Sequence, residues 1–289
     1  AISPSMISMP SPITLVSSTS DIPKTKIHSD KTGQDRMTEF RKLEETVEAD
    51  GVRIEKYRFV EKRLVTRGIP TGEGSFHYVA EATDIFQLCI TLTGGSILLE
   101  PGALQYMHGK IETVVQKHED KGFFGRAIAS AGTGESAFAT KFSGHGTIWT
   151  EPGRRNFILA AIDGPDDALL LDDQAFYACS GGISLTTHKH QSIAGVLSGN
   201  GLMQPKLSGK GVFAVEAPVP VEEIDAIELD GSKELVVDGD FMLMYSASLT
   251  VAIGPLVKGL RNALRSGEGF VYKLTGKGEV YVMPTAKVS

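Results

Sequence analysis

The sequence has few cysteines and no long apolar segment. Its 289 residues include only two cysteines, Cys89 and Cys179, and no Cys-x-x-Cys pair, which excludes a disulfide framework. Both lie in apolar strand-like runs, so we expect buried, inert thiols and a reducing compartment. No run of 18 apolar residues occurs, and this excludes a bilayer-spanning helix.

The motifs of several large enzyme classes are also missing. The sequence contains no P-loop, no Gly-x-Ser-x-Gly, no His-Glu-x-x-His and no paired-carboxylate pattern. These motifs supply a phosphate cradle, a nucleophile, a metal site and an acid–base pair, respectively. We therefore expect a protein that is not an enzyme and that carries no cofactor.

An excess of basic residues is lacking too. The formal net charge is −6; residues 1–36 carry +1 and residues 37–75 carry zero, so residues 76–289 carry −7. Nucleic-acid binding draws most of its affinity from Lys and Arg contacts with phosphate. The acidic body of the chain therefore disfavours single-stranded RNA as a ligand, and RNA binding is only the third hypothesis for function.

Glycine, in contrast, is abundant. Of 32 glycines only Gly33, Gly51 and Gly68 precede residue 71. The others alternate with Val, Ile, Leu, Phe and Thr, a pattern typical of short strands joined by tight turns. This composition excludes a helical bundle, a coiled coil and a disordered chain, and it predicts an all-β fold.

The first 36 residues predict a disordered tail. They are rich in Ser and Pro and contain no basic residue before Lys24, a composition that buries too little apolar surface to fold. The late appearance of basic residues also argues against a secretory signal and an Arg-rich mitochondrial presequence. We therefore expect residues 1–36 to form a disordered tail that is separate from the folded part of the chain.

Residues 37–75 predict an N-terminal extension. Apolar residues three and four apart over 38–50, with Gly51 just beyond, indicate a short surface helix. Residues 52–65 mix charged and apolar side chains and predict one irregular strand. The turn-rich segment 68–74 predicts the boundary with the rest of the chain.

An internal repeat is the strongest pattern in the sequence. A Lys-[Phe/Leu]-[Ser/Thr]-Gly-[His/Lys]-Gly motif begins at Lys141, Lys206 and Lys273, at intervals of 65 and 67 residues. Near-equal intervals of this length are typical of duplicated structural units. We interpret each Gly-x-Gly as a hairpin turn. A fainter half-unit precedes each motif and begins at Leu99, Leu171 and Val237.

The repeat predicts one triplicated β-domain over residues 76–289. Each unit is too small to close a good core alone, so the units should pack together or share a sheet. The expected architecture is a triplicated β-sandwich or double-stranded β-helix-like arrangement, with short helices in the extension and loops. The expected units are residues 76–155, 156–220 and 221–286.

These motifs resemble a known family. The triplicated motif, the Gly134-Glu135-Ser136 and Gly267-Glu268-Gly269 steps and the ending GFVYKLTGKGEVYV resemble the altered-inheritance-of-mitochondria protein 24 family over residues 76–284. The resemblance implies a fold related to the tryptophan RNA-binding attenuator protein, a ring-like homo-oligomer with a trimer favoured, and no catalytic residues. It also implies a cytoplasmic location for a bacterial protein and association with the mitochondrial inner membrane for a eukaryotic one.

Two histidines are the candidate metal ligands. His188 and His190 follow Gly182 in the Gly-x5-His-x-His spacing that opens the cupin metal motif, and residues two apart in a strand share a face. The carboxylate expected about four residues on is replaced by Ala194 and Gly195. We therefore expect exposed strand-end histidines, with a cupin-like metal-binding enzyme as the alternative function.

Glycine-rich apolar loops precede each repeat motif and are the candidate interaction sites. They either pack on the sheets or a neighbouring subunit, or form an apolar rim whose basic residues meet a membrane surface or a partner. The leading hypothesis is a non-enzymatic oligomeric β-scaffold that acts through protein–protein or membrane-surface contacts. The candidate loop residues are Phe123, Phe124, Arg126, Leu256, Lys258, Leu260, Arg261 and Arg265.

Overall fold

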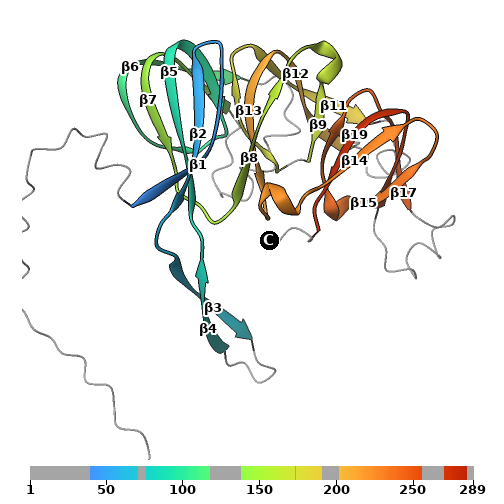
Figure 1. Cartoon of the computed structure of the whole chain (residues 1–289), viewed down its shortest axis with the longest axis horizontal. Helices are drawn as coiled ribbons and strands as arrows, with labels where there is room; N and C mark the ends of the chain where they lie inside the picture. Colours follow the sequence, from blue (N-terminus) through green and yellow to red (C-terminus); the bar gives the residue numbers. More distant parts are fainter. Residues whose placement is uncertain are drawn as a thin grey trace, which may run out of the picture. The chain divides into compact units, whose positions relative to one another are not determined.

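Strands make up nearly all the regular structure. The computed structural model describes residues 40–70, 76–117, 138–172, 174–190, 202–255 and 270–284. Within these ranges the chain forms four antiparallel sheets (Figure 1), which confirms the predicted all-β class. The only helical segments in the same ranges are three 3-10 turns, η1 (Pro165–Asp167), η2 (Val221–Glu223) and η3 (Gly239–Phe241).

The described part of the chain contains no helix of the length and hydrophobicity needed to cross a membrane. The predicted tail, residues 1–36, lies outside the described residues.

The largest sheet has eight strands and curls into a nearly closed barrel. Its strands are β1 (Arg41–Ala49), β2 (Val52–Phe59), β5 (Phe86–Leu99), β6 (Leu104–Lys117), β7 (Phe138–Thr150), β8 (Asn156–Ile162), β10 (Phe176–Ser180) and β13 (Gly211–Ala217). The main path is β1-β2-β5-β10-β13-β8, while β7 pairs with β5 and β6. The two ends of the path meet, because β1 contacts β8 and Lys56 Nζ of β2 donates to the Phe157 carbonyl oxygen of β8 at 3.2 Å.

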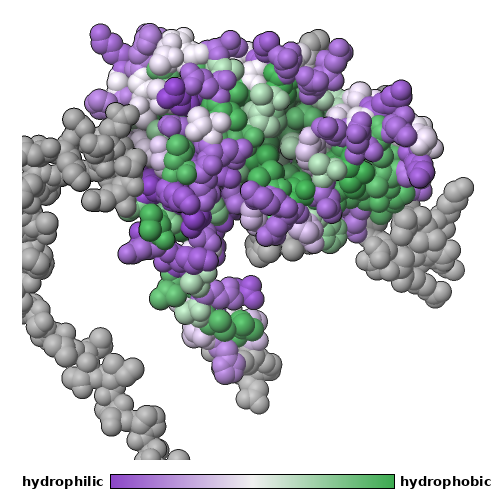
Figure 2. Space-filling view, in the orientation of Figure 1, coloured by the Kyte–Doolittle hydropathy of each residue, from purple (hydrophilic) through white to green (hydrophobic). Residues whose placement is uncertain are grey.

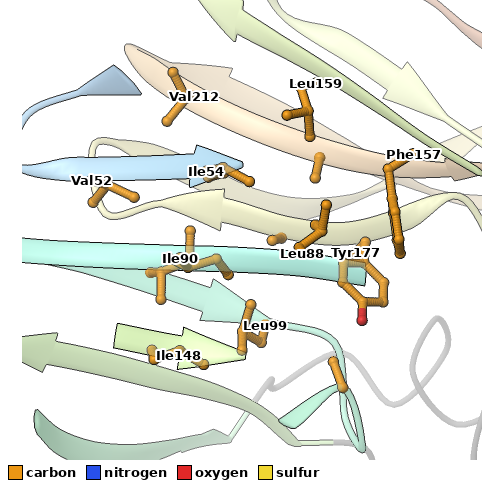
Figure 3. Packing of buried hydrophobic residues seen from close by; sticks show 14 of the residues in the cluster. Val52, Ile54, Leu88, Ile90, Leu99, Ile148, Phe157, Leu159, Tyr177 and Val212 are labelled. Carbon is orange, nitrogen blue, oxygen red and sulfur yellow. The ribbon is translucent and has the colours of Figure 1, made fainter. Parts of the chain in front are cut away.

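Alternate side chains of these strands fill the barrel. Figure 3 shows apolar side chains of β2, β5, β7 and β8 pointing toward one another. Residues two apart in a strand face the same side, so Leu88, Ile90 and Leu92 of β5 all enter this core. Each such side chain contributes about 1.5–3 kcal/mol on burial. The core therefore holds β1 and β2 to the strands that follow them.

The remaining strands form three smaller sheets. The six-stranded sheet has the order β11 (Ile183–His190), β12 (Leu202–Gly209), β9 (Leu169–Leu171), β16 (Met242–Ser246), β19 (Lys277–Val282) and β14 (Asp225–Asp230). The three-stranded sheet has the order β15 (Leu235–Asp238), β18 (Phe270–Thr275) and β17 (Thr250–Pro255). The last sheet is the hairpin of β3 (Arg63–Pro70) and β4 (Phe76–Thr83).

Strands β8–β13 and β14–β19 have the same pairing order. In the first set β8 and β10 pair with β13, and β9 and β11 pair with β12. In the second set β14 and β16 pair with β19, and β15 and β17 pair with β18. Strands β5, β6 and β7 repeat this order in longer, unbroken strands, since β7 pairs along its length with both others. The sequence repeat thus corresponds to a repeat in strand pairing.

The prediction that each Gly-x-Gly is a hairpin turn is wrong. Lys210 separates β12 from β13, yet these strands lie in different sheets, as do β18 and β19 on either side of Gly276. In β7 the strand continues through residues 144–146. The motif is therefore a bend that lets one chain segment serve two sheets. Gly209 is needed there because its φ is +117° and a Cβ would collide with the Gly182 carbonyl oxygen.

The predicted helix over 38–50 is also wrong. Strand β1 occupies most of this range and pairs with β2 through a two-residue turn at Asp50 and Gly51. Both residues have positive φ, +49° and +74°, and Asp-Gly is a preferred sequence for such hairpins. Since β2 also pairs with β5, cross-strand pairing outweighs the helical spacing. The predicted strand over 52–65 is two strands, because β2 ends at Phe59 and β3 begins at Arg63.

Candidate functional site

A buried polar cluster joins the second and third repeat units. His190 of β11 and Gln204 of β12 lie opposite Tyr245 of β16, and all three side chains are buried. Gln204 Oε1 accepts from the Tyr245 hydroxyl at 2.6 Å and lies 2.8 Å from His190 Nε2. The Gln204 amide nitrogen donates to the Tyr272 hydroxyl at 3.4 Å. The polar side chains of the cluster thus find hydrogen-bond partners within it, as buried polar groups generally do in proteins.

His188 lies beside this cluster. Its ring meets that of His190 edge-on at 4.6 Å between centroids, so the two histidines share a face, as the strand spacing predicts. Burial lowers the pKa of both, aided for His188 by Lys206. The expectation of exposed strand-end histidines is wrong for His190, which is 8% exposed, because β16 of the next unit covers it.

The histidine pair does not gather further metal ligands. The described residues contain no group of three or more His, Cys, Asp or Glu side chains placed to hold a metal ion. The Nε2 atom of His190 is also 2.8 Å from Gln204 Oε1 and 3.1 Å from the Tyr245 hydroxyl. A cavity of about 120 Å³ beside His188 is lined by Leu170, Lys206 and Leu249 among others. A cavity of this size has room for a few water molecules.

Two carboxylates lie close together between the first and second units. Burial, followed by the neighbouring Glu216 carboxylate, raises the pKa of Glu100 to about 8, while Arg155 opposes the shift. Burial also raises the pKa of Glu216, whose Oε2 accepts from Arg155 Nη1 at 3.1 Å. Glu100 therefore holds a proton near neutral pH. Local sequence patterns do not indicate this pair, because 116 positions separate residues 100 and 216.

The β3–β4 hairpin carries the most exposed large apolar side chains. Leu64 and Tyr78 are 77% and 73% exposed, and Figure 2 shows hydrophobic residues on this hairpin next to strongly hydrophilic ones. Its two strands pair with each other and with no other strand in the described ranges. A two-stranded hairpin alone is marginally stable in water. The exposed apolar surface is therefore a candidate contact surface.

The other predicted site residues have separate outcomes. Cys89 and Cys179 are buried, as expected, and burial raises the pKa of each thiol to about 12. His145, which lies between the two glycines of the first repeat motif, is exposed on β7. The candidate loop residues all lie outside the described residues: Phe123, Phe124, Arg126, Leu256, Lys258, Leu260, Arg261 and Arg265.

These features define an all-β protein of several antiparallel sheets, one of them a nearly closed barrel, with exposed apolar strands. The chain belongs to the family described as Mitochondrial biogenesis AIM24, which matches residues 79–285. This confirms the resemblance carried by the repeat motifs. Most of the β3–β4 hairpin precedes the matched residues.

Two proteins of Streptococcus pyogenes are similar to this chain. An uncharacterized protein of the serotype M6 strain, M6_Spy0233, is 28% identical over 198 residues, which cover 65% of this chain and 77% of the relative. The crystal structure of SPYM3_0169 matches with a TM-score of 0.52 at 21% identity, covering 78% of this chain and 94% of the other. The structural similarity supports the fold.

Proposed function

We propose that this chain is a non-enzymatic, oligomeric β-scaffold that acts by contact with other macromolecules. We further propose that its sheets derive from three copies of one β-sandwich or double-stranded β-helix-like unit. The shared pairing order of β8–β13 and β14–β19 supports the triplication. The observation that carries the scaffold function is the exposed, uncharged face of the β3–β4 hairpin.

The register of the hairpin places its Arg and Glu residues on one face and leaves the other face uncharged. Leu64 lies opposite Ala82, and Gly68 lies opposite Tyr78. Directly paired residues, and residues two apart along a strand, share a face. Leu64 and Tyr78 therefore lie on one face, together with small or uncharged residues. Arg63, Arg67 and Glu81 occupy the opposite face, where they alternate with Val65, Ile69 and Val79.

This separation favours docking of a protein partner on the apolar face. Burial of apolar surface contributes roughly 25 cal/mol per Å², and exposed apolar patches with a polar border are typical of interaction sites. A partner would also stabilise the hairpin, since three or more strands or a covering element are needed for independent stability.

Substitutions on the two faces test the proposal in the full-length protein. Chemical crosslinking and mass spectrometry should identify partners of the wild type that are lost with Leu64→Ser plus Tyr78→Ser. The matched control is Val79→Ser, which lies opposite Arg67 on the charged face. Partners that survive the double substitution, or that are lost equally with the control, would overturn the hairpin as the contact surface.

Membrane binding has its own test. Co-sedimentation with anionic vesicles should be compared for the wild type, the double hairpin variant, and Phe123→Ser plus Leu260→Ser in the candidate loops. Loss of vesicle binding in only the loop variant supports the loops as a membrane contact. Equal sedimentation of all proteins, or none by any, contradicts that reasoning.

A further inference from the structure

The two junctions between repeat units are built by the same strand pairing. At the first, the end of β5 pairs with β10, with Leu98 opposite Cys179. At the second, β9 pairs with β16, with Leu170 opposite Tyr245. The flanking backbone bonds also correspond. The amide of Glu100 donates to the Tyr177 carbonyl, and in the second junction the amide of Asp172 donates to the Leu243 carbonyl.

The strand register identifies the strand of the third unit that is equivalent to the end of β5 and to β9. The first residue of each repeat motif, a lysine, pairs with Leu98 in the first unit and Leu170 in the second. In the third unit the lysine pairs with Val236 of β15. Strand β15 is therefore equivalent to the end of β5 and to β9. It pairs with β18 and with no other described strand.

A shared register shift identifies the strand of the first unit that is equivalent to β10 and β16. Strands β10 and β16 each have one register shift near their start, after Phe176 and after Met242. Strand β6 has the same shift after Leu104. Counting on from the shift makes Met107 the equivalent of Cys179 and Tyr245. Within the described ranges β6 pairs with β7 alone.

The residues at the two junctions are buried, whereas the equivalent residues on β15 and β6 are exposed. Leu98 and Leu170 are 9% and 3% exposed, whereas the equivalent Val236 is 41% exposed. Cys179 and Tyr245 are fully buried, whereas the equivalent Met107 is 42% exposed. Figure 1 shows β6 and β15 in different units, far apart along the row of strands. The chain thus presents both halves of a junction that it forms twice internally.

We infer that a second copy of this chain docks head-to-tail, with β15 of one copy pairing antiparallel with the first half of β6 of the next. Continuing the internal register places Val236 opposite Met107 and Leu235 opposite His108, so the paired part of β15 brings mainly uncharged side chains to this edge. Such a heterologous contact gives a closed ring when the rotation closes, and a filament when it does not. The inference rests on the oligomer of the proposed function.

Two edge substitutions test the contact by sedimentation velocity of the full chain at micromolar concentration. A lysine on an edge strand opposes pairing with another chain. The wild type should sediment as an oligomer, and Val236→Lys and Met107→Lys should each sediment as a single chain of 31.0 kDa. Circular dichroism checks that each variant is folded.

The matched control is Val114→Lys on the second half of β6. Val114 is equivalent by register to Thr186 and Ala252, because all three pair with the lysine of the repeat motif. All three positions are exposed, so no unit uses this position at a junction. The control variant should keep the size of the wild type, and an equal loss of size would overturn the inference.

Mixing the two edge variants gives the sharpest result. The Val236→Lys variant keeps an intact β6, and the Met107→Lys variant keeps an intact β15, so an equimolar mixture should form a species of twice the single-chain mass. A mixture that stays monomeric overturns the inference. If the wild type is an oligomer and both variants keep its size, the β15–β6 contact is overturned but the oligomeric scaffold still stands. If the wild type is monomeric, both the contact and the oligomeric scaffold are overturned.

Discussion

Lys56 joins the two ends of the barrel, and its replacement tests how much that closure stabilises the protein. The side chain is 7% exposed; its Nζ donates to the Phe157 carbonyl and lies 3.1 Å from Glu45 Oε2. Lys56→Met keeps the apolar stem but removes the charge and the donor. Loss of a charge-assisted hydrogen bond costs about 1.5–3 kcal/mol. Loss of the ion pair with the partly exposed Glu45 adds roughly 0–1 kcal/mol, because solvent screens this pair.

We therefore expect Lys56→Met to lower the free energy of unfolding by about 1.5–4 kcal/mol, measured by urea denaturation followed by fluorescence of Trp149. The control is Arg53→Met, which breaks a 2.8 Å ion pair with Glu48 on the exposed side of the same strand. That change should leave the denaturation midpoint unaltered. Equal shifts of the midpoint in both variants would refute a stabilising role of Lys56 in barrel closure.

Two further predictions concern the carboxylate pair and the strand bends. Since the fold raises the pKa of Glu100 from 4.5 to about 8, the folded protein binds this proton more tightly than the unfolded chain. Stability should fall as pH rises from 4.5 through 8, by at most about 1.4 kcal/mol per pH unit for this proton. Glu100→Gln should reduce the decline in melting temperature between pH 6 and 9, and an unchanged decline would contradict the assignment. Gly209→Ala should lower the free energy of unfolding by about 2–4 kcal/mol, because the new Cβ would collide with the Gly182 carbonyl oxygen. The control Gly102→Ala has open space around its Cβ and should lower it by only about 1–2 kcal/mol. Equal losses of stability in thermal unfolding would contradict the constraint at the strand bend.

The sequence repeat predicted part of the architecture because glycines mark positions where backbones approach closely. The Lys-x-x-Gly-x-Gly motif and the half-units at Leu99, Leu171 and Val237 coincide with equivalent strand positions in the structure. The motif did not reveal that β12 and β13 enter different sheets. A local glycine pattern shows where the chain bends, but the pairing partner depends on residues far away in the sequence.

The helix error over 38–50 has a specific cause. Spacing of apolar residues at three and four positions also occurs by chance in an alternating strand. Gly51 suits the end of a helix, but Asp50-Gly51 is equally a preferred hairpin sequence. The candidate site shows the same limitation. The shared face of His188 and His190 followed from strand geometry, but Gln204 and Tyr245 come from other strands. Their approach to His190 has no local sequence signal.

The strand order of the barrel also determines when it can close during synthesis. Of its first strands, β1 pairs with β2 and β2 pairs with β5, but the opposite end of the path, β8, joins the sheet through β13, which ends at Ala217. Until the ribosome has released that residue, the growing chain holds an open curved sheet with apolar surface exposed. Such long-range pairing folds slowly and exposes intermediates to aggregation. The barrel thus contains the earliest strands of the described residues, yet it is completed only when the chain has been made through Ala217.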